Sequence, residues 1–278
     1  MSVIDNIILR SKNKKAIVAD LHLVDYKNCP VVIFCHGYKG FKDWGDTNLR
    51  AREISDDRFH FLKFNFSHNG GTEEQVKDFP DLEAFSDNNF SIELDDIKRV
   101  VDWVDQGDHV FKEFFNTNKI YLMGYSRGGA NSIIYASEDE RIKKLVTWST
   151  VSALERRFPS GSKLENWKKD GVMYIENTRT KQMMPHKYQF YKDFVLHRSR
   201  LNVSEAEKRL KIPHLLIHGT KDETVYLGEA LHLMSLNENT SLIKIKNGTH
   251  TLGGYHPYTS EKLSPHATAA VNSSIAFL

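Results

Sequence analysis

The 278-residue chain contains only two cysteines, Cys29 and Cys35, and this scarcity excludes a fold built on disulfides. Cys35 ends the apolar run VVIFC, where we expect it to pack as a small hydrophobic residue rather than act as a catalytic thiol. No hydrophobic run approaches the roughly 18 residues that a transmembrane helix needs. Near the start, a short apolar run at 7–9 precedes basic residues, the reverse of the order in a signal peptide. We therefore expect a cytoplasmic protein without membrane contact.

An excess of charge of one sign is also missing. Lys and Arg number 38 against 36 Asp and Glu, for a net charge of +2, so the composition does not favour a nucleic-acid partner. The motifs H-E-x-x-H, paired C-x-x-C, G-x-G-x-x-G and the P-loop lysine motif are all absent. We therefore predict no metal and no cofactor. The sequence does not indicate an oligomeric state.

Short apolar runs recur along the chain and predict strands. Eight segments qualify: 7–9, 16–23, 31–35, 59–65, 119–124, 144–149, 213–219 and 241–247. The first two alternate apolar with polar residues, as half-exposed antiparallel strands do, whereas the later ones are nearly continuously apolar, as in a buried parallel sheet. Helix-like segments lie between them, at 91–106, 127–137, 225–236 and 264–278. This order predicts an α/β fold with an eight-stranded, mostly parallel sheet and helices on both faces.

One stretch of about sixty residues, 150–212, has no clear buried strand. Because long loops in compact domains are usually functional, we interpret it as a cap inserted into a core formed by 1–149 and 213–278. The alternative is a surface excursion without function. Its aromatic and basic side chains would suit an aromatic or anionic acyl group, but they would equally suit aromatics that pack the cap onto the core while the bases face water. These residues are Trp167, Tyr174, Tyr188, Phe190, Tyr191, Phe194, Arg156, Arg157, Arg179, Lys181 and Lys187.

The segment MGYSRGGAN (123–131) places Ser126 between glycines at 124 and 128. G-x-S-x-G alone arises by chance in roughly one chain in ten of this length. Here, however, a buried strand precedes it and a helix follows, as a nucleophile elbow requires. A serine hydroxyl is a weak nucleophile, so it needs a base and a group that orients the base.

Candidates for both partners follow later strands. Asp222 comes just after the strand at 213–219, and His250 just after the strand at 241–247. The order Ser, Asp, His at successive strand ends predicts a catalytic triad at the edge of the sheet. Glu223 and Glu155 remain alternatives to Asp222, while His256 and His266 lie too far past the last strand to be preferred.

A tetrahedral intermediate needs amide donors for its oxyanion. We expect the amide of Arg127, directly after the serine, to supply one. We expect the loop HGYKGFKDW (36–44) to supply the second through the amide of Tyr38, because His36–Gly37 lets the backbone turn tightly. We interpret His36 itself as a structural hydrogen-bonding residue rather than a second base.

With HGYKG, GYSRGG, HGTKDETV and NGTH after the third, fifth, seventh and eighth strands, the chain resembles the α/β-hydrolase superfamily over nearly its whole length apart from the insertion. Within it, the chain is most similar to small serine esterases of the feruloyl-esterase and dienelactone-hydrolase kind and to catalytic domains of prolyl-oligopeptidase-like peptidases. The resemblance implies Ser126 as nucleophile, His250 as base, Asp222 as its orienting group, and the Tyr38 and Arg127 amides as oxyanion hole.

The expected activity is hydrolysis of a small-molecule ester through an acyl-enzyme intermediate, as in a carboxylesterase. Two alternatives stay open. One is a serine aminopeptidase or acyl-peptide hydrolase, for which Glu155, Glu165 or Glu176 in the cap would hold a free amine. The other is a non-catalytic binding protein on the same fold.

Overall fold

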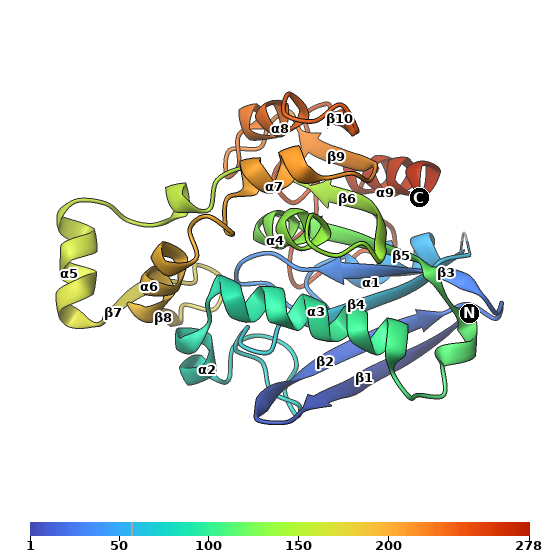
Figure 1. Ribbon diagram of the computed structural model, residues 1–278, viewed down its shortest axis with the longest axis horizontal. Helices are drawn as coiled ribbons and strands as arrows, with labels where there is room; N and C mark the ends of the chain where they lie inside the picture. Colours follow the sequence, from blue (N-terminus) through green and yellow to red (C-terminus); the bar gives the residue numbers. More distant parts are fainter. Residues whose placement is uncertain (57) are drawn as a thin grey trace.

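The computed structural model describes residues 1–56 and 58–278 and is built around one eight-stranded sheet (Figure 1). The strands follow the spatial order β1-β2-β4-β3-β5-β6-β9-β10. Their bounds are β1 Ser2–Ser11, β2 Lys14–Leu23, β3 Cys29–Cys35, β4 His60–Asn65, β5 Phe115–Tyr125, β6 Ile142–Trp148, β9 His214–Gly219 and β10 Thr240–Ile245. β2 pairs antiparallel with β1 and β4, and every other pairing in this sheet is parallel. The predicted eight-stranded, mostly parallel α/β sheet is confirmed.

Helices cover both faces of this sheet. α3 (Phe90–Gln106) and α4 (Arg127–Ala136) lie on one face, whereas α1 (Thr47–Asp56) and α9 (Pro265–Phe277) lie on the other (Figure 1). Successive side chains of a strand point to opposite faces, so Ile33 packs toward α3 and Phe34 toward α1. Both faces of the central strands are therefore buried, which explains their unbroken apolar runs. Among the described residues, no helix is both long and apolar enough to cross a membrane.

The sequence predicted that β2 is half-exposed, because polar residues alternate with apolar ones along it. The structure gives this alternation a different cause. Asp20 and His22 occupy its polar positions, yet both are buried. The loop after β3 covers them, and the Lys42 ammonium donates to Asp20 Oδ2 at 2.6 Å. Lys63 of β4 pairs with the same carboxylate and with Asp43. The polar side of β2 therefore faces a buried ion-pair cluster that ties this loop to the sheet.

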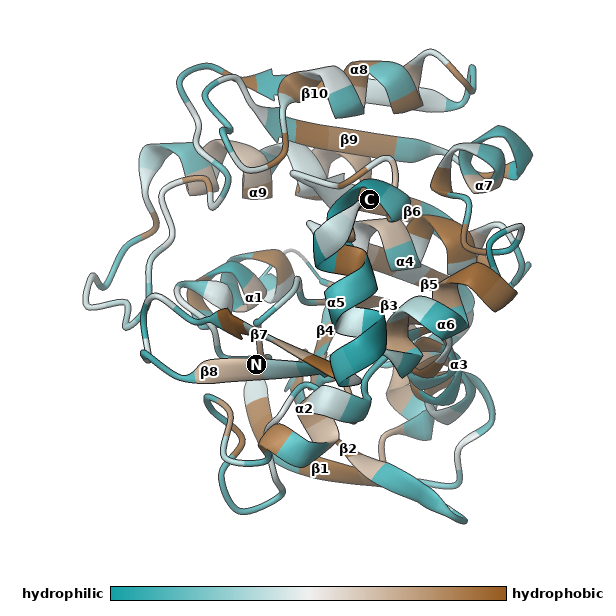
Figure 2. Cartoon of the chain, turned by 90° about the vertical axis from the view of Figure 1, so that its left-hand side faces the viewer, coloured by the Kyte–Doolittle hydropathy of each residue, from teal (hydrophilic) through white to brown (hydrophobic). Residues whose placement is uncertain are grey.

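The 150–212 segment folds into small elements beside the main sheet. They are the 3-10 turn η2 (Glu155–Arg157), α5 (Ser162–Asp170), β7 (Val172–Glu176), β8 (Met183–Lys187), α6 (Gln189–Leu196) and α7 (Val203–Arg209). β7 and β8 form a separate antiparallel pair, which the sequence analysis did not predict because both strands are short and β7 is largely exposed. In Figure 1 these two strands, α5 and α6 extend to one side, and in Figure 2 they lie in front of the sheet.

Aromatic side chains join this segment to the rest of the molecule. Trp167, Phe190 and Phe194 are buried in the same hydrophobic cluster as α3 and α4, and α7 packs against α4. The outer surface of α5 is mostly hydrophilic (Figure 2). Short helices complete the fold: α2 (Leu82–Asp87), η1 (Lys112–Phe114) and α8 (Leu227–Met234).

Candidate active site

Ser126 is the single residue between β5 and α4, so the chain reverses from strand to helix within one residue. Its backbone angles are φ 54° and ψ −117°, a conformation that side-chain-bearing residues rarely adopt. The Ser126 amide donates to the Trp148 carbonyl at 2.9 Å and anchors the turn to β6. The Ser126 hydroxyl makes no capping bond to α4, so it remains available to other groups.

The flanking glycines allow this turn because no Cβ fits at either position. A Cβ at Gly128 would lie 2.3 Å from the His36 carbonyl oxygen and 2.4 Å from that of Cys35. A Cβ at Gly124 would lie 2.6 Å from Gly129 Cα. The start of α4 therefore packs backbone against backbone on the end of β3.

We expect Gly128→Ala to lower the free energy of unfolding by about 2 kcal/mol or more, because the new methyl must displace main-chain atoms. Gly228→Ala is the matched control. Gly228 is exposed in α8, and a Cβ there would meet no other atom within 4 Å, so alanine should raise stability by about 0.5–1 kcal/mol. Urea denaturation of the two variants measures both effects. Equal, small effects would contradict the close packing of α4 on β3.

Asp222 and His250 lie in the loops that follow the neighbouring strands β9 and β10. These loops touch through their main chains, since a Cβ on Gly219 would lie 2.2 Å from the Gly248 oxygen. The His250 Nδ1 atom lies 2.8 Å from Asp222 Oδ2, and its Nε2 atom lies 3.2 Å from Ser126 Oγ. The tertiary structure therefore connects Ser126, His250 and Asp222 in a continuous chain of hydrogen bonds.

The Asp222 carboxylate is fixed by several donors. Its Oδ1 atom accepts hydrogen bonds from the amides of Thr224 at 2.9 Å and Val225 at 2.8 Å. Burial alone would raise the pKa of Asp222, but the hydrogen bonds from His218, His250 and Val225 outweigh it and hold the pKa well below its usual range. Asp222 is therefore a carboxylate at neutral pH.

His218, on β9, is a neighbour of this site that the sequence analysis missed. Its Nε2 atom donates to the Val225 carbonyl at 2.7 Å and lies 3.3 Å from Asp222 Oδ2. The signal was present in HGTKDETV, where a histidine lies four residues before the aspartate, near the end of the buried strand. The spacing in the sequence does not show that the His218 and Asp222 side chains lie close together in the folded chain.

The alternative acids and bases make their contacts elsewhere. Glu223 is exposed beside Asp222, and Glu155 binds Arg198 at 2.9 Å. His256 Nδ1 accepts a hydrogen bond from the Gly45 amide at 3.0 Å, and His266 lies in the first turn of α9. None of these four side chains lines a cavity at Ser126 among the described residues.

Two backbone amides belong to residues that line a cavity together with Ser126, those of Tyr38 and Arg127. Within the described chain, neither the Tyr38 nor the Arg127 amide donates a hydrogen bond to another protein group. Arg127 is the first residue of α4, where amides lack helical partners and the helix dipole favours negative charge. Tyr38 follows Gly37, whose Cα packs so closely that a Cβ there would lie 3.2 Å from Ser126 Cβ.

His36 holds the Tyr38 loop in place. Its Nδ1 atom donates to the Gly37 carbonyl at 2.9 Å, and its Nε2 atom accepts from the Phe66 amide at 3.3 Å. Burial lowers the pKa of His36 to about 4, so the ring stays neutral and keeps this donor–acceptor pattern. Both ring nitrogens are occupied by main-chain partners.

The 150–212 segment reaches the same loop through a side-chain hydrogen bond. The Tyr38 hydroxyl lies 2.7 Å from Nε2 of His186, which belongs to β8. Burial, reinforced by the charges of Arg127 and Lys39, lowers the pKa of His186 to about 3. His186 is therefore neutral, and it is a further site residue that sequence reasoning did not identify.

Buried neutral histidines should make the protein acid-sensitive. The folded-state pKa of His186 lies below the unfolded value of about 6.5, so the unfolded state binds more protons below that pH and stability falls on acidification. We expect His186→Gln to flatten this decline by about 1.4 kcal/mol per pH unit between about pH 6 and about pH 4. The variant should still lose stability on acidification, because burial also lowers the pKa values of His22 and His36. Urea denaturation of both proteins across this range provides the measurement. A parallel pH dependence in the two would contradict a buried neutral His186.

Two cavities of about 180 Å³ each meet at Ser126 and Tyr38. The one that we call the apolar cavity lies toward the 150–212 segment and is lined mostly by hydrophobic side chains, among them Leu154, Phe158, Met173, Ile175 and Phe190. The one that we call the polar cavity is also lined by His250, and its wall combines the charged residues Lys39, Asp46 and Arg50 with the aromatic residues Phe41, Trp44 and Tyr125.

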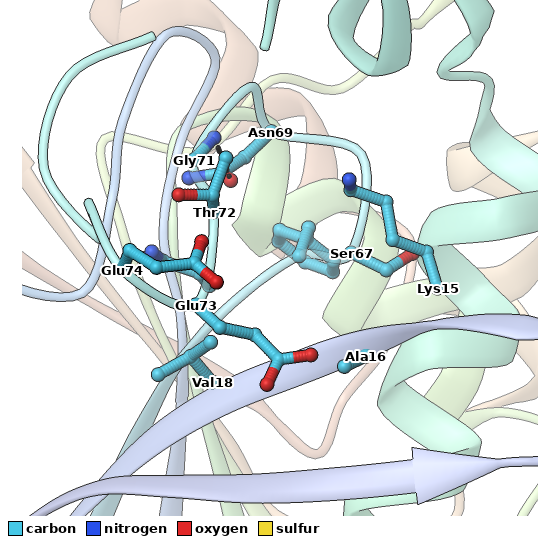
Figure 3. A pocket seen from close by; sticks show the side chains of 11 residues that line it. Lys15, Ala16, Val18, Ser67, Asn69, Gly71, Thr72, Glu73 and Glu74 are labelled. Carbon is cyan, nitrogen blue, oxygen red and sulfur yellow. Dashed lines mark hydrogen bonds between the residues drawn. The ribbon is translucent and has the colours of Figure 1, made fainter. Parts of the chain in front are cut away.

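A cavity of about 230 Å³ lies apart from Ser126, between the start of β2 and the loop after β4 (Figure 3). Lys15, Ser67, Asn69, Thr72 and Glu73 line it. None of the residues around this cavity belongs to the hydrogen-bonded chain of Ser126, so we assign the candidate active site to the two smaller cavities.

Comparisons with known proteins identify the family and the fold of the chain. The model of the alpha/beta hydrolase fold family matches residues 30–186, more than half of the chain. The chain therefore belongs to the α/β-hydrolase family. A comparison with curated protein sequences finds no match.

Several solved structures share the fold of this chain over nearly its whole length. Est1E from Butyrivibrio proteoclasticus with bound ferulic acid superposes with a TM-score of 0.75 at 18% identity, covering 98% of this chain and 97% of that one. DcsB in complex with its substrate analogue gives 0.73 at 15% identity, with 99% and 98% covered. A putative dienelactone hydrolase from Klebsiella pneumoniae gives 0.59 at 13% identity, with 99% and 98% covered. At these identities the likeness establishes the shared fold.

Proposed function

We propose that the protein is a serine hydrolase that cleaves carboxylic esters through an acyl-enzyme intermediate. The observation that carries the proposal is the hydrogen-bonded chain Ser126–His250–Asp222, with distances of 3.2 Å and 2.8 Å, at the junction of two cavities. Membership of the α/β-hydrolase family and the fold shared with esterases support it. No cofactor takes part in this mechanism.

In the first half-reaction, His250 Nε2 takes the proton of Ser126 Oγ as the oxygen attacks the ester carbonyl carbon. The carbonyl oxygen becomes an oxyanion, which the amides of Tyr38 and Arg127 stabilise. The intermediate collapses when His250 returns the proton to the leaving alcohol oxygen. Water then attacks the acyl-enzyme in the same way, releasing the acid and restoring Ser126.

The position of His250 decides which cavity takes which half of the ester. Because His250 protonates the leaving oxygen, the alcohol must leave on its side, which is the polar cavity. The acyl group then occupies the apolar cavity between Ser126 and the 150–212 segment. We therefore propose that this segment acts as a cap that shapes the acyl site, with residues 1–149 and 213–278 forming the catalytic core.

Among the described residues, no unpaired carboxylate lines either cavity at Ser126 to hold the free amine that the aminopeptidase alternative requires. Glu155 and Glu176 bind Arg198 and Lys181, and neither they nor Glu165 line a cavity at Ser126. Asp46 lines the polar cavity, but it pairs with Arg50 at 2.7 Å. A comparison of p-nitrophenyl butyrate with aminoacyl p-nitroanilides tests the choice. Faster turnover of the anilides would favour the peptidase, and absence of both activities would favour a binding protein.

A further inference from the structure

The side chain of Arg127 forms part of the wall of the apolar cavity. Its guanidinium carbon lies 4.7 Å from the ring centre of Tyr38 and 5.8 Å from those of Phe90 and Phe190. These rings confine the planar group without occupying its N–H donors. The sequence predicts a role for the Arg127 amide alone, so this side chain is an additional polar feature beside the proposed nucleophile.

Most of the Arg127 donors have no protein partner. Within the described chain, its side chain makes one hydrogen bond, from Nη2 to Glu93 Oε1 at 2.6 Å. A guanidinium carries five N–H donors. The side chain remains 16% exposed, and none of its nitrogens is a fully buried atom without a hydrogen-bond partner. A ligand in the cavity can therefore reach these donors in a mostly apolar wall.

Glu93 fixes the orientation of Arg127 and neutralises its charge. The Glu93 carboxylate is buried and accepts from Asn88 Nδ2 at 2.7 Å and from Asn131 Nδ2 at 2.5 Å in addition to Arg127. This network holds the carboxylate still, so the guanidinium cannot turn to another partner. The cavity is therefore lined by a cation that already has its counter-ion.

The second charged side chain in the wall of the apolar cavity, that of Arg157, is also neutralised by a carboxylate. Arg157 lines the cavity and pairs with Glu229. His186 is neutral, and no carboxylate lines the cavity among the described residues. Both charged side chains that line the apolar cavity are thus paired with carboxylates, which weakens the attraction that an anionic acyl group would need to offset its desolvation.

We propose that Arg127 selects acyl groups that are uncharged and carry a hydrogen-bond acceptor, such as an ether or carbonyl oxygen, and that Glu93 prevents the cavity from favouring an anionic acyl group. This inference rests on the proposed esterase function and specifies its substrate class. An acceptor that reaches Arg127 exchanges water for a charge-assisted hydrogen bond. A simple alkyl chain leaves the guanidinium donors without a partner once water is displaced.

Three p-nitrophenyl esters with the same leaving group test this proposal. Pentanoate and 3-methoxypropanoate have the same shape, with one methylene replaced by an ether oxygen, and the monoester of glutaric acid adds a terminal carboxylate. The ratio of kcat/KM for methoxypropanoate over pentanoate reports the acceptor preference. The ratio for glutarate over pentanoate reports the charge preference. Both ratios cancel any general loss of catalytic efficiency.

Two variants separate the roles of the ion pair. In Arg127→Met combined with Glu93→Gln, we expect the methoxypropanoate ratio to fall at least about tenfold, because the donor is lost without leaving an unpaired buried carboxylate. In Glu93→Gln alone, Arg127 keeps its donors but loses its counter-ion, so the glutarate ratio should rise about tenfold. The inward amide oxygens of Asn88 and Asn131 lack partners, so either amide can flip to accept from glutamine.

Arg156→Met is the matched control, since Arg156 is an exposed arginine of the cap that does not line the apolar cavity. Both ratios should match the wild type in this variant. Unchanged ratios in the Arg127 and Glu93 variants would overturn the proposal while leaving the esterase function intact. A wild-type preference for glutarate over pentanoate would overturn the uncharged substrate class. If the wild type hydrolyses none of the three esters, the proposed function itself fails.

Discussion

Ser126→Ala is expected to lower kcat/KM for p-nitrophenyl butyrate by at least ~10³-fold. The hydroxyl oxygen is the atom that forms the acyl-enzyme bond, and no other hydroxyl lies within hydrogen-bonding distance of His250 Nε2 in the described chain. The residual rate should come from the unpaired amides and from binding alone. Steady-state hydrolysis followed at the nitrophenolate absorbance measures the effect.

Ser11→Ala serves as the control, because Ser11 is exposed at the end of the edge strand β1. A fluorophosphonate probe gives an independent measurement, since it reacts with a serine only when a base activates it. The wild type and the Ser11 variant should be labelled, and the Ser126 variant should not. Ester turnover that survives in Ser126→Ala would refute the proposed nucleophile.

Asp222→Asn is expected to lower kcat by about 10³–10⁴-fold, with a smaller effect on KM. An asparagine amide in place of Oδ2 would face His250 Nδ1 with a donor, which favours the wrong tautomer of the imidazole. The loop should stay folded, since an asparagine oxygen can still accept the Thr224 and Val225 amides. Kinetics with the same ester provide the measurement.

Glu223→Gln is the matched control for this substitution, because it changes an exposed neighbouring carboxylate in the same loop. Its kcat should stay within about twofold of the wild type, as expected for a surface position. A large loss of kcat in the Glu223 variant with little loss in the Asp222 variant would show that Glu223, and not Asp222, orients His250.

The lowered pKa of Asp222 also predicts a pH dependence of stability. A carboxyl group whose folded-state pKa lies below its unfolded value stabilises the fold above about pH 4, and this contribution disappears as the pH falls further. The difference in melting temperature between wild type and Asp222→Asn should therefore be largest at neutral pH and shrink below about pH 4. A difference that grows on acidification would contradict the assigned charge state.

Local patterns were sufficient to predict the sheet. Continuous apolar runs such as VVIFC identify strands that are buried on both faces, because each face of a parallel sheet is covered by helices. The pattern was misleading at β2, where Asp20 and His22 look like solvent-facing positions but are buried, and Asp20 pairs with Lys42 of the loop after β3. A periodic pattern shows which positions are polar, but it does not show whether a polar side chain faces water or a buried ionic partner.

The short strands β7 and β8 could not be predicted for a related reason. In the described part of the chain they pair with each other and with no other strand, and they pack through single large side chains such as Met184, so they lack the long apolar run of a core strand. His186 was missed with them, since its importance depends on its 2.7 Å contact with Tyr38, a residue 148 positions earlier in the chain. A contact between residues so far apart in the sequence produces no periodic pattern that could be used to predict it.

By itself, the sequence determined the α/β class, the number of strands in the main sheet, and the positions of Ser126, Asp222 and His250 as candidates after strands β5, β9 and β10. Those properties follow from local patterns, because strand ends and glycine turns are encoded within a few residues. Only the tertiary structure decided that Nδ1 and Nε2 of His250 reach Asp222 and Ser126, and that Arg127 with its Glu93 counter-ion borders the apolar cavity. These distances depend on the relative placement of strands and helices that are far apart in the chain, and that placement is set by packing of the whole core.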